Sequence, residues 1–386
     1  MAYSPGENQG NYMLLKALPF SISFLMIPLV ALAAIYGGWW IAVPFLWGWL
    51  AVGLLDKIIG LDTDNMDPKL RDDMLFWHKM VTWAWVPAQF ALIVFVLWQA
   101  TRPGHLTAGE SIGVALALGA ATGGIGIVYA HEMIHQRNRW EKWAGEFLLI
   151  STGYGHFATE HVFGHHITVG TPADPVSARK GESLYAFMFR AIPGTLISAW
   201  KIDRKRLARR ERPVWHKSNP FWRYGLGVLA FCLIAFALGG WWAVGLFAIQ
   251  AAMAIVQLEA VNYVEHYGLQ RQYIGNGRFE RVGPHHSWNA AHKVSNWLLI
   301  NLQRHSDHHF RPDRRFPLLQ HYSWNEAPQL PLSYAFMIGI ATNPPLWFWI
   351  MNRRVDRWRA KFYPDVDDWS AYDRGTIGQE PVEAAA

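Results

Sequence analysis

The sequence predicts an all-α integral membrane protein with six transmembrane helices in three hairpins and a cytoplasmic His-rich helical domain. Three observations support this prediction. Of the 386 residues, 52% are hydrophobic, and the chain contains 22 Trp, 21 Phe and 14 Tyr. Several apolar runs approach the roughly 20 residues that an α-helix needs to cross a bilayer. Lys and Arg are concentrated in the long segments between these runs.

Six apolar runs are candidate spans, and they form three pairs separated by short links. The runs cover residues 18–37, 39–55, 81–100, 111–130, 219–238 and 241–258. The short links are Gly37-Gly38, Thr101–Glu110 and Gly239-Gly240. A further apolar stretch, Leu332 to Ile350, is interrupted by Pro344-Pro345, so we expect it to lie at the interface or to pack on the domain.

The distribution of Lys and Arg predicts the orientation. The short links contain a single basic residue, Arg102, whereas residues 131–218 and 267–386 contain fourteen Lys or Arg each. Because basic loops stay in the cytoplasm, we expect these two segments, both termini and the active site at the cytoplasmic face of the inner membrane. We expect a single domain over residues 1–386, without a cleaved signal peptide. The tail, residues 375–386, is expected to be disordered or to link to a further module.

A basic run, Lys201–Lys217, contains eight Lys or Arg against Asp203 and Glu211. One interpretation is an anchor to anionic membrane lipid. The other is a docking surface for an acidic electron carrier. We attribute the net charge of +6 to contact with the anionic inner leaflet of the membrane, because the sequence contains no nucleic-acid-binding motif.

Cys232 is the only cysteine. Within this sequence it excludes an intrachain disulfide, a Cys-based zinc site, an iron–sulfur cluster and a fused rubredoxin centre. An electron-transfer centre must therefore come from a partner or from histidines.

Nine of the 17 histidines fall into four tight clusters, which we expect on hydrophobic helices. They are His131, His135, His161, His165, His166, His266, His305, His308 and His309. Imidazole is the commonest protein metal ligand, and one ion rarely takes more than four protein ligands, so nine are enough for two metals. Residues four apart share one helix face, and all clusters are expected at the cytoplasmic depth.

Carboxylates accompany these clusters and are candidates to accept imidazole N–H groups. Four are adjacent to a cluster histidine: Glu132, Glu160, Glu265 and Asp307. Glu259 lies seven residues before His266, on the same helix face; it is either a functional acid within the membrane or the partner of an arginine or hydroxyl.

Other patterns leave alternatives open. The segment from His131 to His135 also matches the zinc-protease signature with a glutamate as general base. Small residues in the fourth run, such as Gly119 and Gly123, either leave room for a tunnel or allow close helix packing. Four tryptophans of the second run mark either a tunnel or the membrane interface: Trp39, Trp40, Trp47 and Trp49.

The His clusters resemble the boxes of the integral-membrane di-iron family of fatty-acid desaturases and hydroxylases. The segments Asn262–Leu269 and Leu302–His309 resemble more closely those of the membrane-bound alkane 1-monooxygenases. One departure is Gln136, where that family has a basic residue after the first box.

The resemblance implies a non-haem di-iron oxygenase that uses O2 and two electrons to hydroxylate the terminal methyl group of a medium- or long-chain n-alkane. It further implies that the nine histidines hold two iron ions and that rubredoxin and its reductase supply the electrons. The alternative on the same scaffold is a fatty-acid desaturase or hydroxylase, and elemental analysis separates either from a zinc protease.

Overall fold

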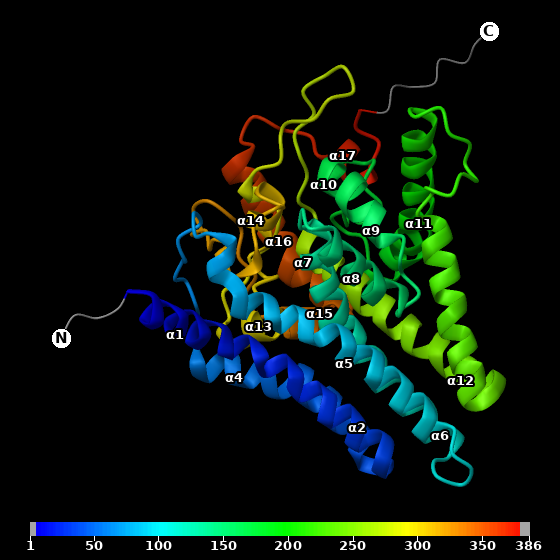
Figure 1. Cartoon of the computed structure of the whole chain (residues 1–386). Coiled ribbons are helices and arrows are strands. Elements are labelled where there is room, and N and C mark those ends of the chain that lie inside the picture. Colours follow the sequence, from blue (N-terminus) through cyan, green and yellow to red (C-terminus); the bar gives the residue numbers. More distant parts are fainter. Residues whose placement is uncertain (1–4, 379–386) are drawn as a thin grey trace.

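The computed structural model describes residues 5–378, with side chains from residue 10, and is predominantly helical over this range (Figure 1). The described residues contain no β-strand, only isolated β-bridges. The α-helices are α1 (Pro5–Ala17), α2 (Met26–Tyr36), α3 (Val43–Phe45), α4 (Val52–Ile59), α5 (Phe76–Ala100), α6 (Ala108–Ala121), α7 (Val128–His135), α8 (Arg139–Ile150), α9 (Phe157–Glu160), α10 (His166–Thr168), α11 (Leu184–Ala208), α12 (Phe221–His266), α13 (Lys293–Leu298), α14 (His305–Phe310), α15 (Tyr334–Ala341), α16 (Pro344–Phe362) and α17 (Ser370–Arg374). The tighter or wider helical segments are η1 (Leu18–Leu25), η2 (Gly38–Ala42), η3 (Leu46–Ala51), η4 (Asp72–Leu75), η5 (Thr122–Ile127), η6 (His161–His165), η7 (Pro284–His286) and η8 (Phe316–Leu318). Most of the tail for which disorder was expected, from residue 379 onward, lies outside the described residues.

Within the described residues, five helices are long and apolar enough to cross a membrane. They cover Gly10–Tyr36, Gly38–Ile59, Asp72–Ala100, Ala108–His135 and Phe221–His266. The first four overlap the first four predicted runs. The fifth contains both of the last two runs, which were predicted to form separate fifth and sixth helices. In the structure they form one element, α12, with a kink between them. The protein is thus a multi-pass membrane protein.

The fifth helix is too long for a single crossing. At about 1.5 Å per residue, its 46 residues extend over roughly 69 Å, against a hydrocarbon core of about 30 Å. Its helical geometry breaks at Gly239 (φ −162°, ψ 27°) and Gly240 (φ 63°, ψ −152°), where the sequence predicted a link. Only glycine readily adopts the positive φ of Gly240, and α12 bends sharply there in Figure 1.

The three predicted links meet at one end of the molecule. The Glu110 side chain accepts a hydrogen bond from the backbone N–H of Gly38 at 2.9 Å, which joins the first two links. The same carboxylate forms a capping box with Thr107 at the start of α6. The Thr101 hydroxyl lies 3.4 Å from the carbonyl oxygen of Leu238, which joins the second link to the third.

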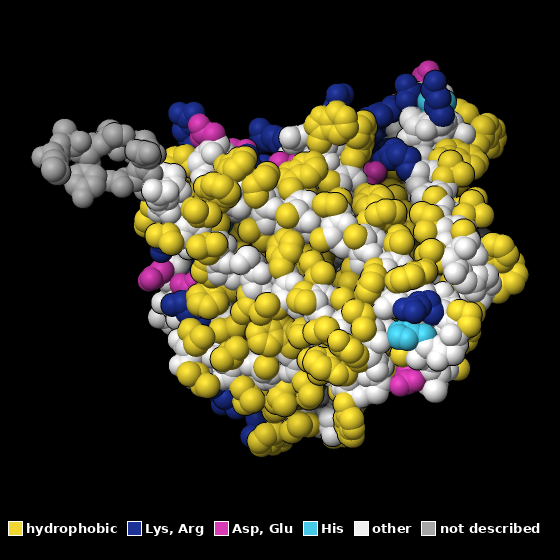
Figure 2. Space-filling model, turned by 60° about the horizontal axis from the view of Figure 1, so that its bottom comes forward, with side chains coloured by type: hydrophobic (Ala, Val, Ile, Leu, Met, Phe, Trp, Pro, Cys, Tyr) yellow, Lys and Arg dark blue, Asp and Glu magenta, His cyan; other side chains and the backbone are white. Residues whose placement is uncertain are grey.

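The surface over the long helices is strongly apolar. Figure 2 shows hydrophobic side chains covering most of this face, with Lys and Arg gathered near its edges. Large side chains such as Phe189, Trp241 and Ile58 are between 79% and 84% exposed. A water-soluble protein rarely exposes so continuous an apolar surface, whereas lipid chains cover it at no cost.

Shorter helices pack at the ends of the long ones, and the His clusters lie on these shorter helices and on the ends of the fourth and fifth long helices. The buried Asp56 at the end of α4 accepts hydrogen bonds from the backbone N–H groups of Val294 (2.8 Å) and Ser295 (3.0 Å), which fixes α13 against the second span. The apolar stretch 332–350 forms α15 and the start of α16 rather than a span, and Tyr334 and Trp347 pack in a core with the end of α12.

Candidate metal centre

The nine clustered histidines reach one place from four parts of the fold. His131 and His135 lie on α7, which continues the fourth span. His266 is the last residue of α12, and a third set, on α14, consists of His305, His308 and His309. The remaining three lie where α9 continues into the widened turn η6 and then α10: His161, His165 and His166. Such widened turns occur frequently at functional sites.

The side chains form two groups, within each of which one ligand atom per residue lies within 4.8 Å of the others. The five-His group consists of His131, His135, His161, His166 and His308. The four-His group consists of His165, His266, His305 and His309. His161 and His165, four residues apart, are thus divided between the groups, although the spacing predicted a shared face. The widened turn η6 carries both residues.

The Nε2 atoms point toward one another within each group. The Nε2 atom of His309 lies 3.0 Å from that of His305 and 3.2 Å from that of His165. The Nε2 atom of His166 lies 3.0 Å from that of His308 and 3.1 Å from that of His161. Two imidazole nitrogens that bind one ion at about 2.1 Å and at right angles lie about 3.0 Å apart, so these separations fit metal ligation.

Two further properties fit a metal ion in each group. The Nε2 atoms of His131 and His135 are buried without a hydrogen-bond partner among the described residues. Burial, together with repulsion between neighbouring rings, lowers the pKa of His161, His305 and His308 well below its ordinary value. These side chains are therefore neutral near pH 7, which is the form that binds metals.

The four-His group is also in contact with carboxylates. The Asp174 side chain accepts a hydrogen bond from Nδ1 of His165 at 2.9 Å, and both side chains are fully buried. Burial opposes ionisation of Asp174, but His165 keeps its pKa below the ordinary value. A Glu265 oxygen lies 3.3 Å from Nε2 of His305. Asp174 thus lies behind the His165 imidazole, where a carboxylate fixes the tautomer and orientation of a ligand and raises its basicity. Glu265 instead lies on the Nε2 side of His305, the side that faces the other histidines of the group.

Sequence reasoning did not include Asp174. Asp174 is the only carboxylate between His166 and Glu182, in the segment Thr171-Pro-Ala-Asp174-Pro. Its position as a lone acid close to a His cluster is the sequence feature that could have identified it as a partner of a ligand histidine.

The structure places the other four predicted carboxylates away from the histidines. Each has a hydrogen-bond or ion-pair partner that is not one of the clustered histidines. Glu132 accepts hydrogen bonds from Gln136 and the backbone N–H of Phe316. Glu160 accepts one from Ser198. Glu259 accepts from Tyr154 and Asn262. Asp307 is paired with Arg314. Glu132 is thus engaged elsewhere and does not present a free general base to the site, which argues against the zinc-protease interpretation.

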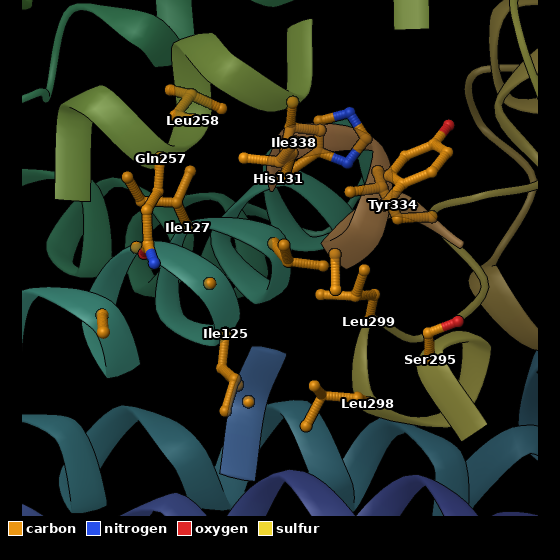
Figure 3. Close-up of a pocket in the computed structure, with 18 of the residues that line it drawn as sticks. Ile125, Ile127, His131, Gln257, Leu258, Ser295, Leu298, Leu299, Tyr334 and Ile338 are labelled. Carbon is orange, nitrogen blue, oxygen red and sulfur yellow. The ribbon is translucent and has the colours of Figure 1, made fainter. Parts of the chain in front are cut away.

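An apolar cavity of about 110 Å³ adjoins both His groups. His131 and His161 of the five-His group line it, as does His305 of the four-His group. Figure 3 shows His131 and Tyr334 on one side, with Ile125, Ile127, Leu258, Leu298, Leu299 and Ile338 around the open space. Its lining also includes Trp49, which is 43% exposed. The cavity lining thus contains both buried histidines and a side chain that reaches the outer surface.

The small residues of the fourth span serve both predicted purposes. A Cβ atom on Gly119 would lie 2.5 Å from the backbone oxygen of Gln250, and one on Gly123 would lie 2.7 Å from the Cα of Ala254. These two glycines allow close packing of α6 and η5 on α12. Gly123 and Gly124 both line the cavity, and a Cβ atom on Gly124 would meet no atom closer than the Gln257 Oε1 atom, at 3.8 Å.

Comparisons with known proteins agree with this site. The fatty acid desaturase family model matches residues 110–341. Alkane 1-monooxygenase 2 of Pseudomonas aeruginosa is 38% identical over 83% of this chain and 88% of its own length. Alkane 1-monooxygenase 1 of Alcanivorax borkumensis is 37% identical over 89% of this chain and 85% of its own. The xylene/toluene monooxygenase hydroxylase component XylM of Pseudomonas putida is 27% identical over 95% and 94%.

The matched residues include all nine histidines, and the fold is a multi-pass helical membrane protein with a His-rich centre. The chain belongs to the fatty acid desaturase family, and within it to the alkane 1-monooxygenases. It is therefore an oxidoreductase, and the histidines are its candidate iron ligands.

Proposed function

We propose that this enzyme hydroxylates the terminal methyl group of medium- or long-chain n-alkanes to primary alcohols. The reaction consumes one O2, two electrons and two protons; one oxygen atom enters the C–H bond and the other leaves as water. The observation that carries the proposal is the position of two His groups at the inner end of a narrow apolar cavity.

We assign one iron ion to each His group, giving two per chain. Two bound irons would supply the activation of O2 that side chains cannot perform. The five-His group and the four-His group would hold the ions through neutral imidazoles, with Asp174 and Glu265 offsetting part of the positive charge of the second.

The cavity lining favours a hydrocarbon over an acyl substrate. The described residues that line it include no Lys or Arg, so they offer no counter-ion to a carboxylate or a phosphate. An n-alkane has no polar group and partitions into the bilayer, and the half-exposed Trp49 in the cavity lining supports access from the lipid. Apolar walls orient the chain and exclude water from the reacting end.

We further propose six membrane crossings. Two of them belong to α12, one on each side of Gly240, and the His groups lie on the cytoplasmic side. The contacts among the three short links support a common outer end, and the excess of Lys and Arg in the other segments supports the orientation. Both termini would then be cytoplasmic, and rubredoxin with its reductase would deliver electrons from that side.

Purified enzyme supplied with labelled octane, labelled acyl substrate, a rubredoxin system and O2 tests the reaction. We expect 1-octanol with one oxygen from O2, and about two irons per chain by elemental analysis. His131→Ala, His165→Ala and His308→Ala should each abolish turnover and lower bound iron, whereas His105→Ala should not. Acyl turnover without octanol, one zinc per chain, or full iron and activity in all three variants would overturn the proposal.

A further inference from the structure

A polar cavity lies behind the five-His group and takes no part in the proposed reaction. It has a volume of about 290 Å³ and lies between α8, α9, α11 and the start of α12. Its charged lining residues are Lys142, Glu146, Asp203, Arg206, Arg210 and Arg223. Four cations thus face two carboxylates, which leaves a formal excess of two positive charges.

The two carboxylates already have partners. The Arg223 guanidinium donates to both oxygens of Glu146, at 2.9 Å to Oε1 and 3.0 Å to Oε2. Arg206 donates to Asp203 at 2.9 Å. Within the described residues, the side-chain nitrogens of Lys142 and Arg210 have no recorded hydrogen-bond or ion-pair partner. The excess charge therefore belongs to two side chains that are free to bind an anion.

An apolar groove continues from the polar cavity. It runs between α5, α8 and α12, and Phe90, Phe147 and Phe231 line it. Glu146 and Arg223 line both hollows, so the ion pair they form marks the boundary between them. One hollow fits a negative headgroup and the other, along two membrane-crossing helices, fits an acyl chain.

The surroundings place this boundary at the membrane interface. Trp140 and Trp143 on α8 are 55% and 49% exposed, as expected for tryptophans at headgroup depth. Arg206 and Arg210 belong to the basic run Lys201–Lys217, for which the sequence allowed an anchor to anionic lipid or a dock for an acidic carrier. The adjoining apolar groove favours the lipid interpretation, because an acyl chain would fill the groove and a soluble electron carrier would not.

We propose that the cavity and groove together bind one anionic phospholipid of the surrounding bilayer, with its phosphate among Lys142, Arg206, Arg210 and Arg223 and one acyl chain in the groove. The inference is independent of the reaction proposed above.

Occupation of this site would stabilise the scaffold of the five-His group. The helix α8 packs directly on α7, since a Cβ atom on Gly145 would lie 2.8 Å from the Ile134 side chain and 2.9 Å from the Ala130 carbonyl oxygen. Ile134 itself lines the polar cavity, between the helix positions of His131 and His135. A bound lipid would therefore hold α8, and through it the helix of two proposed ligands.

Lipid binding to the purified holoenzyme tests the proposal without any turnover. Bound lipid is counted by native mass spectrometry, and affinity is measured by thermal shift on titration with phosphatidylglycerol or phosphatidylcholine. Since each nearby Lys or Arg contributes roughly fivefold to anionic lipid binding, two free cations should give phosphatidylglycerol about a 20-fold preference. Inorganic phosphate alone should not stabilise the protein, because it leaves the groove empty.

Two variants and one control locate the site. The double variant Lys142→Gln/Arg210→Gln breaks no recorded ion pair and should remove most of the preference for phosphatidylglycerol. Ala230→Phe should fill the groove and weaken both lipids without changing charge. Lys201→Gln/Arg209→Gln removes two charges from the same basic run outside the cavity lining and should retain the preference.

Three outcomes would overturn the proposal. One is equal affinity for the two lipids in the unmodified protein. Another is equal loss of phosphatidylglycerol in the double variant and its control. The third is unchanged lipid binding in the double variant with a raised KM for rubredoxin, which would assign the cavity to the electron carrier.

Discussion

The two His groups lie side by side, yet their surroundings differ. In the four-His group every imidazole is at most 5% exposed, and Asp174 and Glu265 lie against His165 and His305. In the five-His group His135 and His166 are half-buried. Within the described residues no carboxylate is recorded in contact with this group. One site is thus enclosed and partly charge-compensated, and the other is more open and held by imidazoles alone.

This difference indicates that the two metal positions have different tolerance to change. A group of four ligands has none to spare, because four is the number that a metal usually takes from protein. A group of five can lose one and still offer four, so such a variant is expected to lose less iron even though its turnover is lost. The carboxylates add to the asymmetry, since both contact the four-His group, and Asp174 orients and strengthens His165 there.

The largest effect is expected from removing a ligand on each side. His309→Ala should lower bound iron by about one ion per chain and reduce turnover more than 100-fold, because a lost ligand costs more than a lost second-layer carboxylate. His135→Ala should retain more iron. Elemental analysis and octanol formation measure both, with His105→Ala, at the opposite end of the molecule, as the control. Equal iron loss in the two ligand variants would contradict the expected difference in tolerance between the two His groups.

An intermediate effect is expected at Asp174. Asp174→Asn keeps a hydrogen-bond acceptor for His165 but removes the charge, and it should lower iron affinity or turnover about 10- to 100-fold. Asp56→Asn is the matched control, because Asp56 is also buried and accepts hydrogen bonds, but from the backbone of α13. Titration of iron into the apo form separates the two. If both variants behave alike, the effect of Asp174 is structural.

The smallest effect is expected at the cavity beside the five-His group. Gly124→Ala adds a methyl group to the cavity wall without a close contact and should favour shorter alkanes by about 10-fold or less in the ratio of kcat/KM values. Gly119→Ala adds the same group outside the cavity lining, against the backbone oxygen of Gln250, and should lower the thermal stability instead. Competition between octane and dodecane, with a thermal melt, measures both. A change of chain-length preference in Gly119→Ala alone would place the substrate elsewhere.

Short-range sequence patterns predicted much of the arrangement of the membrane helices and the His clusters. The apolar runs predicted four of the candidate spans, and the Gly239-Gly240 link coincides with the break in α12. The sequence predicted that the four His clusters would lie at one depth, and the structure brings the nine histidines into two groups. Such signals are local: the length of an apolar run and the period of a helix require no knowledge of what packs against them.

Tertiary structure decided how the clusters divide and which acids serve them. His165 and His166 are neighbours in sequence but belong to different groups, because successive residues of a helix point in different directions and the two rings contact His266 of α12 and His135 of α7, respectively. Asp174 reaches His165 through a loop, whereas Glu132, next to His131 in sequence, points to Gln136 and Phe316. By itself the sequence determined the membrane helices and the number of imidazoles, because both depend on residues a few positions apart. The partition of ligands and the choice of carboxylates depend on contacts between distant segments, and only the packed fold defines those.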